Sequence, residues 1–293
     1  MDSKTTVGVV GLGIMGRAFA LNARKEGFPV VAWNRGEGRA EGLAAEGITI
    51  VGSPAEVVDR ADVVIVMVSD VEAVRAVLEG PGGVLTGKVR GKTILQMSTI
   101  DADATRRFAV ATSSAGAFYL DTPVAGSKPL AEAGEVIVLA GGDAALIERW
   151  NPVLLAIGKQ VVHAGAIGMG TALKLCMNLI VAQMTTALCE AVTLAKAQAL
   201  DPTRIFDVLR VSPALDCGYF RAKERPLLTR DFAPQFSLRN MLKDARFIEA
   251  AAEAAGVALP VTSAVRVIME EASHRGFGDD DLSGIVRIID RPK

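Results

Sequence analysis

Residues 7–35, VGVVGLGIMGRAFALNARKEGFPVVAWNR, decide the fold of this chain. The apolar run at residues 7–10 predicts a buried strand, residues 17–26 have a helical pattern, and the run at residues 29–33 predicts a second strand. Between the first strand and the helix stands Gly11-Leu12-Gly13-Ile14-Met15-Gly16. This places a G-x-G-x-x-G motif at the strand-to-helix turn of a βαβ unit, the context in which the motif indicates dinucleotide binding.

There is a physical reason for glycine at each of the three glycine positions of this motif. Gly11 permits a tight turn, Gly13 lets the backbone approach a pyrophosphate, and Gly16 lets the helix pack closely on the strand. The helix N-terminus offers free N–H groups and a partial positive charge to phosphate groups. The stretch therefore predicts a dinucleotide site, and the alternative is a glycine-rich turn in another kind of α/β protein.

The end of the second predicted strand indicates which dinucleotide binds. Units that bind NAD usually place Asp or Glu there for the ribose 2′-OH, whereas an Arg accommodates the 2′-phosphate of NADP. Here the strand ends in Asn34 and Arg35, and Arg39 follows one turn later. Guanidinium groups form paired hydrogen bonds to phosphate oxygens, so we expect NADP(H) to be preferred over NAD(H). If both arginines are only solvated surface charges, the choice of cofactor stays open.

Composition narrows the class of protein. A chain of 293 residues suggests about two domains, and half of its residues are hydrophobic, enough for a large core. The net charge is −1 with no basic stripe, so we expect neither a nucleic-acid partner nor a membrane partner. The first residues lack the pattern of a secretion signal, and three cysteines suit a reducing compartment, so a cytoplasmic location is expected. No cysteine pair has zinc-ligand spacing, so no metal site is expected.

The first half alternates short apolar runs with helical stretches. Such runs are typical of strands that are covered on both faces, and their alternation with helices predicts a doubly wound, mostly parallel sheet. We therefore predict an α/β Rossmann domain over residues 1–164, with Asp143 as the N-cap of a helix that runs to Ile157. Its further strands are expected at residues 48–51, 62–68, 92–97, 118–121 and 136–139.

The second half, residues 165–293, shows no convincing strand and is predicted to be all-helical. One long helix, at about residues 168–199, links it to the first domain, and this helix has no charge between Lys174 and Glu190. Asn178 and Gln183 argue against a membrane span. A helix this apolar needs other protein surface packed around most of its faces. We therefore expect a homodimer or homotetramer joined through the helical domain. Further helices are expected at residues 202–211, 238–256, 260–275 and 282–289.

Lys174 is the best candidate for catalysis in this helix. Burying a lysine in an otherwise uncharged helix is costly, and Asn178 shares its face at i, i+4. An ammonium group can donate a hydrogen bond and then a proton to a carbonyl oxygen during hydride transfer. The alternative is that Lys174 extends to the surface and that Asn178 serves a helix contact.

Four segments follow one another along the chain: Gly11–Gly16, Asp121-Thr122-Pro123-Val124-Ala125-Gly126-Ser127, Gly165-x-x-Gly168-x-Gly170-x-x-x-Lys174-x-x-x-Asn178, and Lys243-Asp244. Together they resemble the β-hydroxyacid dehydrogenase family, which includes 3-hydroxyisobutyrate dehydrogenase and the glyoxylate/succinic semialdehyde reductases. The run Gly126-Ser127-Lys128-Pro129-Leu130-Ala131-Glu132-Ala133-Gly134 is most similar to the NADPH-dependent semialdehyde reductase branch.

The resemblance implies a role for each of these positions. Lys174 would be the proton donor and acceptor, with Asn178 orienting it. Ser98 and Thr99 would lie beside the nicotinamide, with Thr99 also near the substrate. The loop Ala125-Gly126-Ser127 would offer N–H groups to a substrate carboxylate, as an anion nest can. The remaining implied positions are Met67 and Val68 lining the cofactor cleft, Phe236 walling the pocket, and Lys243 and Asp244 reaching it on the cofactor and substrate sides.

Several of these residues could instead have a purely structural role. Met67 and Val68 could simply pack their strand, Phe236 could be ordinary core, and Lys243-Asp244 could be a solvated helix pair. One position departs from the family pattern: Ala125 stands where the family usually has Ser, and this removes one hydrogen bond to a carboxylate.

The resemblance implies an NADPH-dependent reductase of small aldehyde or keto acids. The rival interpretations are an imine reductase on the same fold, which generally lacks this lysine, and a catalytically silent NADP-binding scaffold protein.

Overall fold

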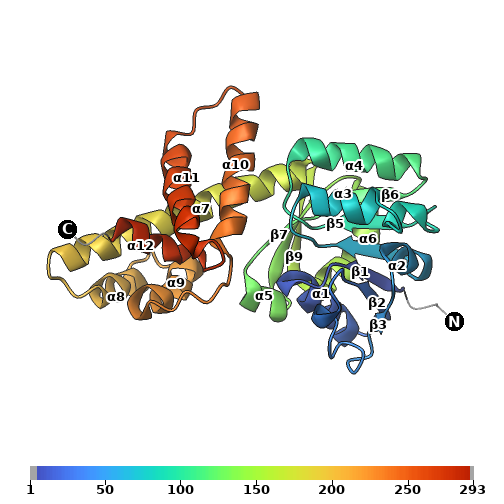
Figure 1. Cartoon of the computed structure of the whole chain (residues 1–293), viewed down its shortest axis with the longest axis horizontal. Helices are drawn as coiled ribbons and strands as arrows, with labels where there is room; N and C mark the ends of the chain where they lie inside the picture. Colours follow the sequence, from blue (N-terminus) through green and yellow to red (C-terminus); the bar gives the residue numbers. More distant parts are fainter. Residues whose placement is uncertain (1–4, 291–293) are drawn as a thin grey trace. The chain divides into compact units, whose positions relative to one another are not determined.

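The computed structural model describes residues 5–290, and Figure 1 shows their helices and strands. Contacts divide the chain into two compact units with a boundary between Lys174 and Leu175. The first unit holds the glycine motif and every strand of the described residues, and the second is helical. This is the Rossmann-type sheet followed by an all-helical region that the sequence predicts.

The sheet of the first unit has nine strands in the order β3-β2-β1-β4-β5-β6-β8-β7, with β9 beside β8. The first six run parallel, whereas β8 is antiparallel to β6 and β7. The order 3-2-1-4-5-6 is that of a dinucleotide-binding sheet, with its switch point between β1 and β4. The strands are β1 (Val7–Val10), β2 (Val30–Trp33), β3 (Thr49–Ile50), β4 (Val63–Val66), β5 (Thr93–Gln96), β6 (Phe118–Asp121), β7 (Val124–Ala125), β8 (Val136–Gly141) and β9 (Gly158–Gly165).

Helices cover both faces of this sheet (Figure 1). Phe19 and Trp150 pack on one face with Ile65, while Phe108 packs on the other with Val64, because successive strand side chains point to opposite faces. Asp143 begins α6 as predicted, since its side chain accepts a hydrogen bond from the N–H of Leu146. The helices are α1 (Ile14–Lys25), α2 (Pro54–Arg60), α3 (Val71–Glu79), α4 (Ala102–Ser114), α5 (Lys128–Glu132) and α6 (Ala144–Ile157).

The helical unit has its own core around residues such as Phe206, Met241 and Met269. Helix α7 (Met169–Ala197) begins in the first unit and continues into the second. By length and apolar composition it could cross a membrane, with a mean hydropathy of 1.5, but the same test is passed by the core helix of a folded unit, and Val192 lies in this core. The other helices are α8 (Thr203–Val211), α9 (Gly218–Thr229), α10 (Leu238–Ala254), α11 (Pro260–Ala272) and α12 (Val286–Ile289).

The structure differs from the sequence-based expectation at several places. Strands β7 and β9 and helices α5 and α9 were not predicted. The helix expected at residues 282–289 is a short 3₁₀ turn at residues 282–285 followed by α12. As expected, the described residues beyond Gly165 form no strand, and only an isolated bridge joins Ser237 to Asp281.

Candidate active site

The glycine turn after β1 has no room for side chains. Gly11 has φ of +99°, and a Cβ there would lie 2.2 Å from the carbonyl oxygen of Met67, at the end of β4. A Cβ on Gly16 would lie 1.9 Å from the carbonyl oxygen of Gly11. No side chain caps the first turn of α1, whose N-cap residue is Gly13. The turn therefore presents bare backbone and a free helix N-terminus at the switch point of the sheet, as a pyrophosphate requires.

Asn34 joins the end of β2 to this turn. Its side-chain oxygen accepts a hydrogen bond from the N–H of Leu12 at 2.9 Å, and its amide nitrogen donates to the carbonyl of Gly36 at 2.7 Å. Ile14 and Met15 open α1 directly beyond the turn. The predicted cofactor residue Asn34 thus fixes the glycine turn from within the protein.

The predicted phosphate ligands Arg35 and Arg39 are exposed. The guanidinium of Arg39 lies near the glycine turn, since a Cβ on Gly13 would be 3.4 Å from its Nη1. Arg17 donates hydrogen bonds to the carbonyls of Arg39 and Glu41 and so holds the segment that carries Arg39. The structure therefore places two exposed positive groups just beyond β2, and one of them lies near the glycine turn.

Ser98 ties together the ends of β4 and β5. Its hydroxyl accepts a hydrogen bond from the N–H of Val68 at 2.9 Å, and its backbone is bonded to the buried amide of Gln96. Thr99 follows in a half-buried position. Met67, Val68, Ser98 and Thr99 therefore lie at the carboxyl edge of the parallel strands, where the glycine turn also lies.

The loop at the end of β7 is shaped by its backbone. Gly126 has φ of +146°, and a Cβ there would lie 2.8 Å from Val136. Ser127 begins the short helix α5 without a side-chain cap, and Ala125, which ends β7, is half-buried. The loop has the backbone freedom that the resemblance requires, and Ala125 contributes only a methyl group.

The sequence interpretation assigned no role to Asp121, the last residue of β6, which is fully buried. One carboxylate oxygen accepts the N–H of Gly168 and the other that of Thr171, both at 2.8 Å. Burial raises the pKa of this carboxyl, and the two amides act in the opposite direction. A Cβ on Gly170 would lie 2.4 Å from the carbonyl of Leu139, so the chain needs glycine for this close approach.

Asp121 therefore fastens the start of α7 to the carboxyl end of β6. A carboxylate there satisfies N–H groups that a helix leaves unpaired and interacts favourably with its dipole. Lys174 follows Thr171 by three residues, so it lies one turn into the helix that begins at this edge, and only 8% of it is exposed. Asn178, one turn further, is 4% exposed.

The helical unit supplies a second group of candidate residues. The amide nitrogen of Asn178 donates to Oδ2 of Asp244 at 2.6 Å, so the structure provides Asn178 with a buried acidic partner on α10. Lys243 forms an ion pair with Oδ1 of Asp244 at 2.9 Å, and its ammonium lies 5.0 Å from the centre of the Phe247 ring. Phe236 is half-buried in the loop before α10.

The predicted residues thus form two groups, one in each unit. The first comprises the glycine turn, Asn34, Met67, Val68, Ser98 and Lys174. The second comprises Asn178, Lys243 and Asp244, and in it Asp244 accepts a hydrogen bond from Asn178 and pairs with Lys243. A dinucleotide fits the first group because glycine leaves its turn open and arginines flank it. Across residues 5–290, no cluster of His, Cys, Asp and Glu has the makeup of a metal site.

Two family models together match nearly the whole chain. Residues 6–165 match the NAD binding domain of 6-phosphogluconate dehydrogenase. Residues 168–289 match the model described as the NAD-binding domain of NADP-dependent 3-hydroxyisobutyrate dehydrogenase.

Individual relatives agree with these models. The chain is 34% identical to glyoxylate/succinic semialdehyde reductase 1 of Arabidopsis thaliana, over 97% of this chain and 98% of the relative. It is 30% identical to 2-(hydroxymethyl)glutarate dehydrogenase of Eubacterium barkeri, over 98% and 96%. The crystal structure of 3-hydroxyisobutyrate dehydrogenase from Salmonella typhimurium superimposes with a TM-score of 0.89 at 26% identity, covering 97% of this chain and 100% of the other. The chain therefore belongs to the 3-hydroxyisobutyrate dehydrogenase-like β-hydroxyacid dehydrogenase family, whose members are NAD(P)-dependent dehydrogenases acting on hydroxy acids.

Proposed function

We propose that this protein is an NADPH-dependent reductase that interconverts a small aldehyde or keto acid and the corresponding hydroxy acid, with Lys174 as the acid/base catalyst. The observation that supports this most strongly is the pair of hydrogen bonds that Asp121 accepts from the N–H groups of Gly168 and Thr171 at the start of α7. They anchor the helix that carries Lys174 at the strand edge where the glycine turn and Ser98 also lie.

The residues of this chain would hold the cofactor at three points. The glycine turn and the N-terminus of α1 would bind the pyrophosphate, and Arg35 and Arg39 would bind the 2′-phosphate that distinguishes NADPH from NADH. Met67, Val68, Ser98 and Thr99 would line the cleft at the ends of β4 and β5. When bound, the reduced nicotinamide supplies the hydride that reduces a carbonyl carbon.

Lys174 supplies the proton in this proposal. Its ammonium donates a hydrogen bond to the carbonyl oxygen, transfers a proton as negative charge develops there, and takes the proton back in the oxidative direction. Asn178 lies one turn away on the same face, and its bond to Asp244 holds its side chain in one orientation. Lys243 would approach the cofactor and Asp244 the substrate side, with Phe236 as a wall of the pocket.

The proposed substrate class is supported by the relatives and by the loop at residues 125–127. Glyoxylate and succinic semialdehyde both combine an aldehyde with a carboxylate, and backbone N–H groups of this loop would bind the carboxylate. Ala125 leaves this interaction without a hydroxyl, so we infer that backbone groups, Ser127 or Lys128 supply the contact.

A turnover assay tests this proposal against its rivals. Purified protein is given NADPH and a panel of aldehydo and keto acids from glyoxylate upward, and in parallel a cyclic imine. Oxidation of NADPH by the carbonyl acids supports the proposal. Turnover of the imine alone would identify an imine reductase, and no turnover with either would leave an NADP-binding protein without catalysis.

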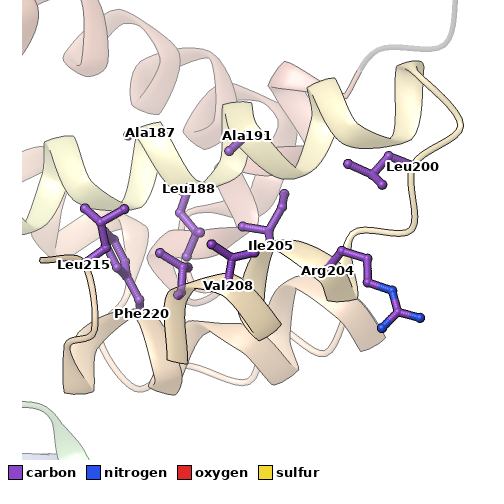
Figure 2. Close-up of a pocket in the computed structure, with 10 residues that line it drawn as sticks. Ala187, Leu188, Ala191, Leu200, Arg204, Ile205, Val208, Leu215 and Phe220 are labelled. Carbon is purple, nitrogen blue, oxygen red and sulfur yellow. The ribbon is translucent and has the colours of Figure 1, made fainter. Parts of the chain in front are cut away.

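We further propose that a second copy of this chain covers the helical unit. An apolar pocket of about 510 Å³ lies between α7, α8 and α9, and Figure 2 shows Leu188, Ile205, Val208 and Phe220 around it. Val208 and Val211 are strongly exposed beside it. Only 44% of an apolar 18-residue stretch of α7 is buried within the chain. The exposed apolar surface of this helix therefore needs additional cover.

Light scattering at micromolar concentration tests the assembly. We expect at least a dimer for the wild type, a monomer for Val208→Glu, and an unchanged assembly for Val257→Glu, which places the same charge at another exposed valine of the helical unit. A monomeric wild type would contradict the proposal.

A further inference from the structure

A buried ion pair lies in the helical unit, and its two residues have been given no role so far. Nζ of Lys223 on α9 lies 2.7 Å from Oδ1 of Asp281, and the two residues are 3% and 0% exposed. Charges buried in this way are costly unless the geometry is good and the remaining lone pairs are satisfied. The hydrogen bonds around the ion pair therefore indicate which part of the protein it stabilises.

The second oxygen of Asp281 binds backbone rather than another side chain. Oδ2 accepts hydrogen bonds from the N–H groups of Gln235 and Phe236, at 3.2 and 3.3 Å. Oδ1 also accepts from the N–H and the hydroxyl of Ser283, at 3.0 and 2.6 Å. Burial raises the pKa of this carboxyl, but Lys223 and Ser283 outweigh it and hold the pKa below its ordinary value, so Asp281 is a carboxylate at neutral pH.

The segment that Asp281 binds through Gln235 and Phe236 is the loop that leads into α10. The N–H of Asp281 donates to the carbonyl of Phe232 at 2.9 Å, and that of Leu282 donates to the carbonyl of Phe236 at 3.0 Å. The N–H of Leu238, the first residue of α10, donates to the carbonyl of Asp280 at 2.9 Å. The backbone around Phe236 is thus bonded on both sides to the segment that Lys223 anchors.

The same helix carries the partner of Asn178. Asp244 lies on α10, less than two turns beyond Leu238, and accepts the hydrogen bond from Asn178. Displacing the first turn of α10 would therefore disturb both the Phe236 loop and the Asn178–Asp244 contact.

We propose that Lys223 and Asp281 are positioning residues for the reaction, which fix the backbone of Phe236 and the start of α10 and thereby set the substrate side of the pocket. This rests on the function proposed above, because Phe236 and Asn178 have their site roles only there. Lys223 acts through Asp281, and Asp281 acts through the two amides that it binds.

Steady-state kinetics of Lys223→Met provides the first test. We expect KM for the aldehyde or keto acid to rise about tenfold. The Kd for NADPH should change far less, because the glycine turn and the arginines proposed to bind it lie in the other unit and, of these residues, only Lys243 lies on α10. Val265→Ala is the matched control: it removes packing from the same core but none of the hydrogen bonds that hold this loop. It should lower Tm and leave KM unchanged.

Amide hydrogen exchange provides a readout that does not need turnover. In Lys223→Met, the amides of residues 235–241 should exchange faster than in the wild type, and those of β1 and α1 should not. Ser283→Ala, which removes one hydrogen bond to Asp281, should change both readouts in the same direction and by less, and replaces Lys223→Met if that variant does not fold.

Unchanged KM and unchanged exchange in these variants, or an equal rise of KM in Val265→Ala, would overturn the positioning role. A wild type that reduces no carbonyl acid would instead reject the proposed function, and the exchange measurement would then decide alone whether the pair fixes the loop.

Discussion

Asp121 in the Rossmann unit and Asp281 in the helical unit are both fully buried, but their charges are balanced differently. Asp121 is bound by two backbone amides at the start of α7, and burial raises the pKa of its carboxyl. Asp281 is bound by Lys223 as well as by amides and a hydroxyl, and these hold the pKa of its carboxyl below its ordinary value. Two backbone amides at the start of a helix thus hold the buried carboxyl group of Asp121, whereas the loop before α10 is held by a carboxylate that also binds a lysine.

The largest expected effect follows from breaking the ion pair. Asp281→Asn leaves Lys223 buried without its anion, so we expect a loss of about 3–5 kcal/mol in the free energy of unfolding at neutral pH. Urea unfolding followed by circular dichroism measures this loss. A variant as stable as the wild type would show that the pair contributes nothing to the helical unit.

Acid should narrow this difference between the variant and the wild type. Since the folded-state pKa of Asp281 lies below its ordinary value of 3.8, its contribution is complete above that value and is lost as pH falls through the folded-state pKa. Cys189 and Tyr219 also face the pair, but burial raises the pKa of Cys189 to about 12 and also raises the pKa of Tyr219, so neither titrates in acid. A difference in stability that stays constant down to strong acid would contradict the assignment of the charge.

Asp121→Asn should have a smaller effect because no unpaired charge remains. An asparagine offers one oxygen to the two amides and turns its own N–H groups toward the other, so we expect a loss of about 1.5–3 kcal/mol together with a reduced kcat as the start of α7 shifts. Tryptophan fluorescence during urea unfolding suits this measurement, since both tryptophans, Trp33 and Trp150, lie in the Rossmann unit.

Asp143→Asn is the matched control for this variant. Asp143 caps α6 at the surface, where asparagine serves equally well, so its stability and kcat should match those of the wild type. Equal behaviour of the two variants would mean that Asp121 is only an ordinary helix cap.

The cofactor residues of the Rossmann unit provide the next prediction. Arg35→Ala should lower kcat/KM for NADPH about ten- to a hundredfold, the value of one or two charged hydrogen bonds, and leave kcat/KM for NADH nearly unchanged. Arg60→Ala, another surface arginine of the same unit, should alter neither. Equal losses with both cofactors would reject the 2′-phosphate assignment.

The smallest expected effect is a gain. Ala125→Ser adds a hydroxyl beside the carboxylate-binding loop and should raise kcat/KM for glyoxylate or succinic semialdehyde about tenfold. The absence of any gain would show that the pocket holds its substrate in another way.

The parts of the fold that were predictable have local patterns. The βαβ unit is predicted by an apolar run, a glycine turn and a second apolar run. The all-helical second half is predicted because no strand-like apolar run occurs after about residue 165. Strand β9 was missed because Lys159, Gln160 and His163 are exposed and interrupt any apolar run. Helix α9 was missed because it contains Pro226 among charged residues.

The same distinction applies to the site. The glycine turn and the Lys174–Asn178 spacing are visible in the sequence because their members are neighbours along the chain. Asp121 lies 47 residues along the chain from its partner Gly168, and Asp281 lies 58 residues from its partner Lys223. No local pattern marks such pairs, so only the folded structure reveals them.

The most direct test of the account is the rate of Lys174→Gln at saturating NADPH. We predict that kcat for reduction falls by about 10²–10⁴, the usual contribution of a positioned acid or base, while the Kd for NADPH stays at the wild-type value. A variant that keeps a near wild-type kcat would contradict the central claim that the amine anchored at the carboxyl edge of the sheet donates the proton.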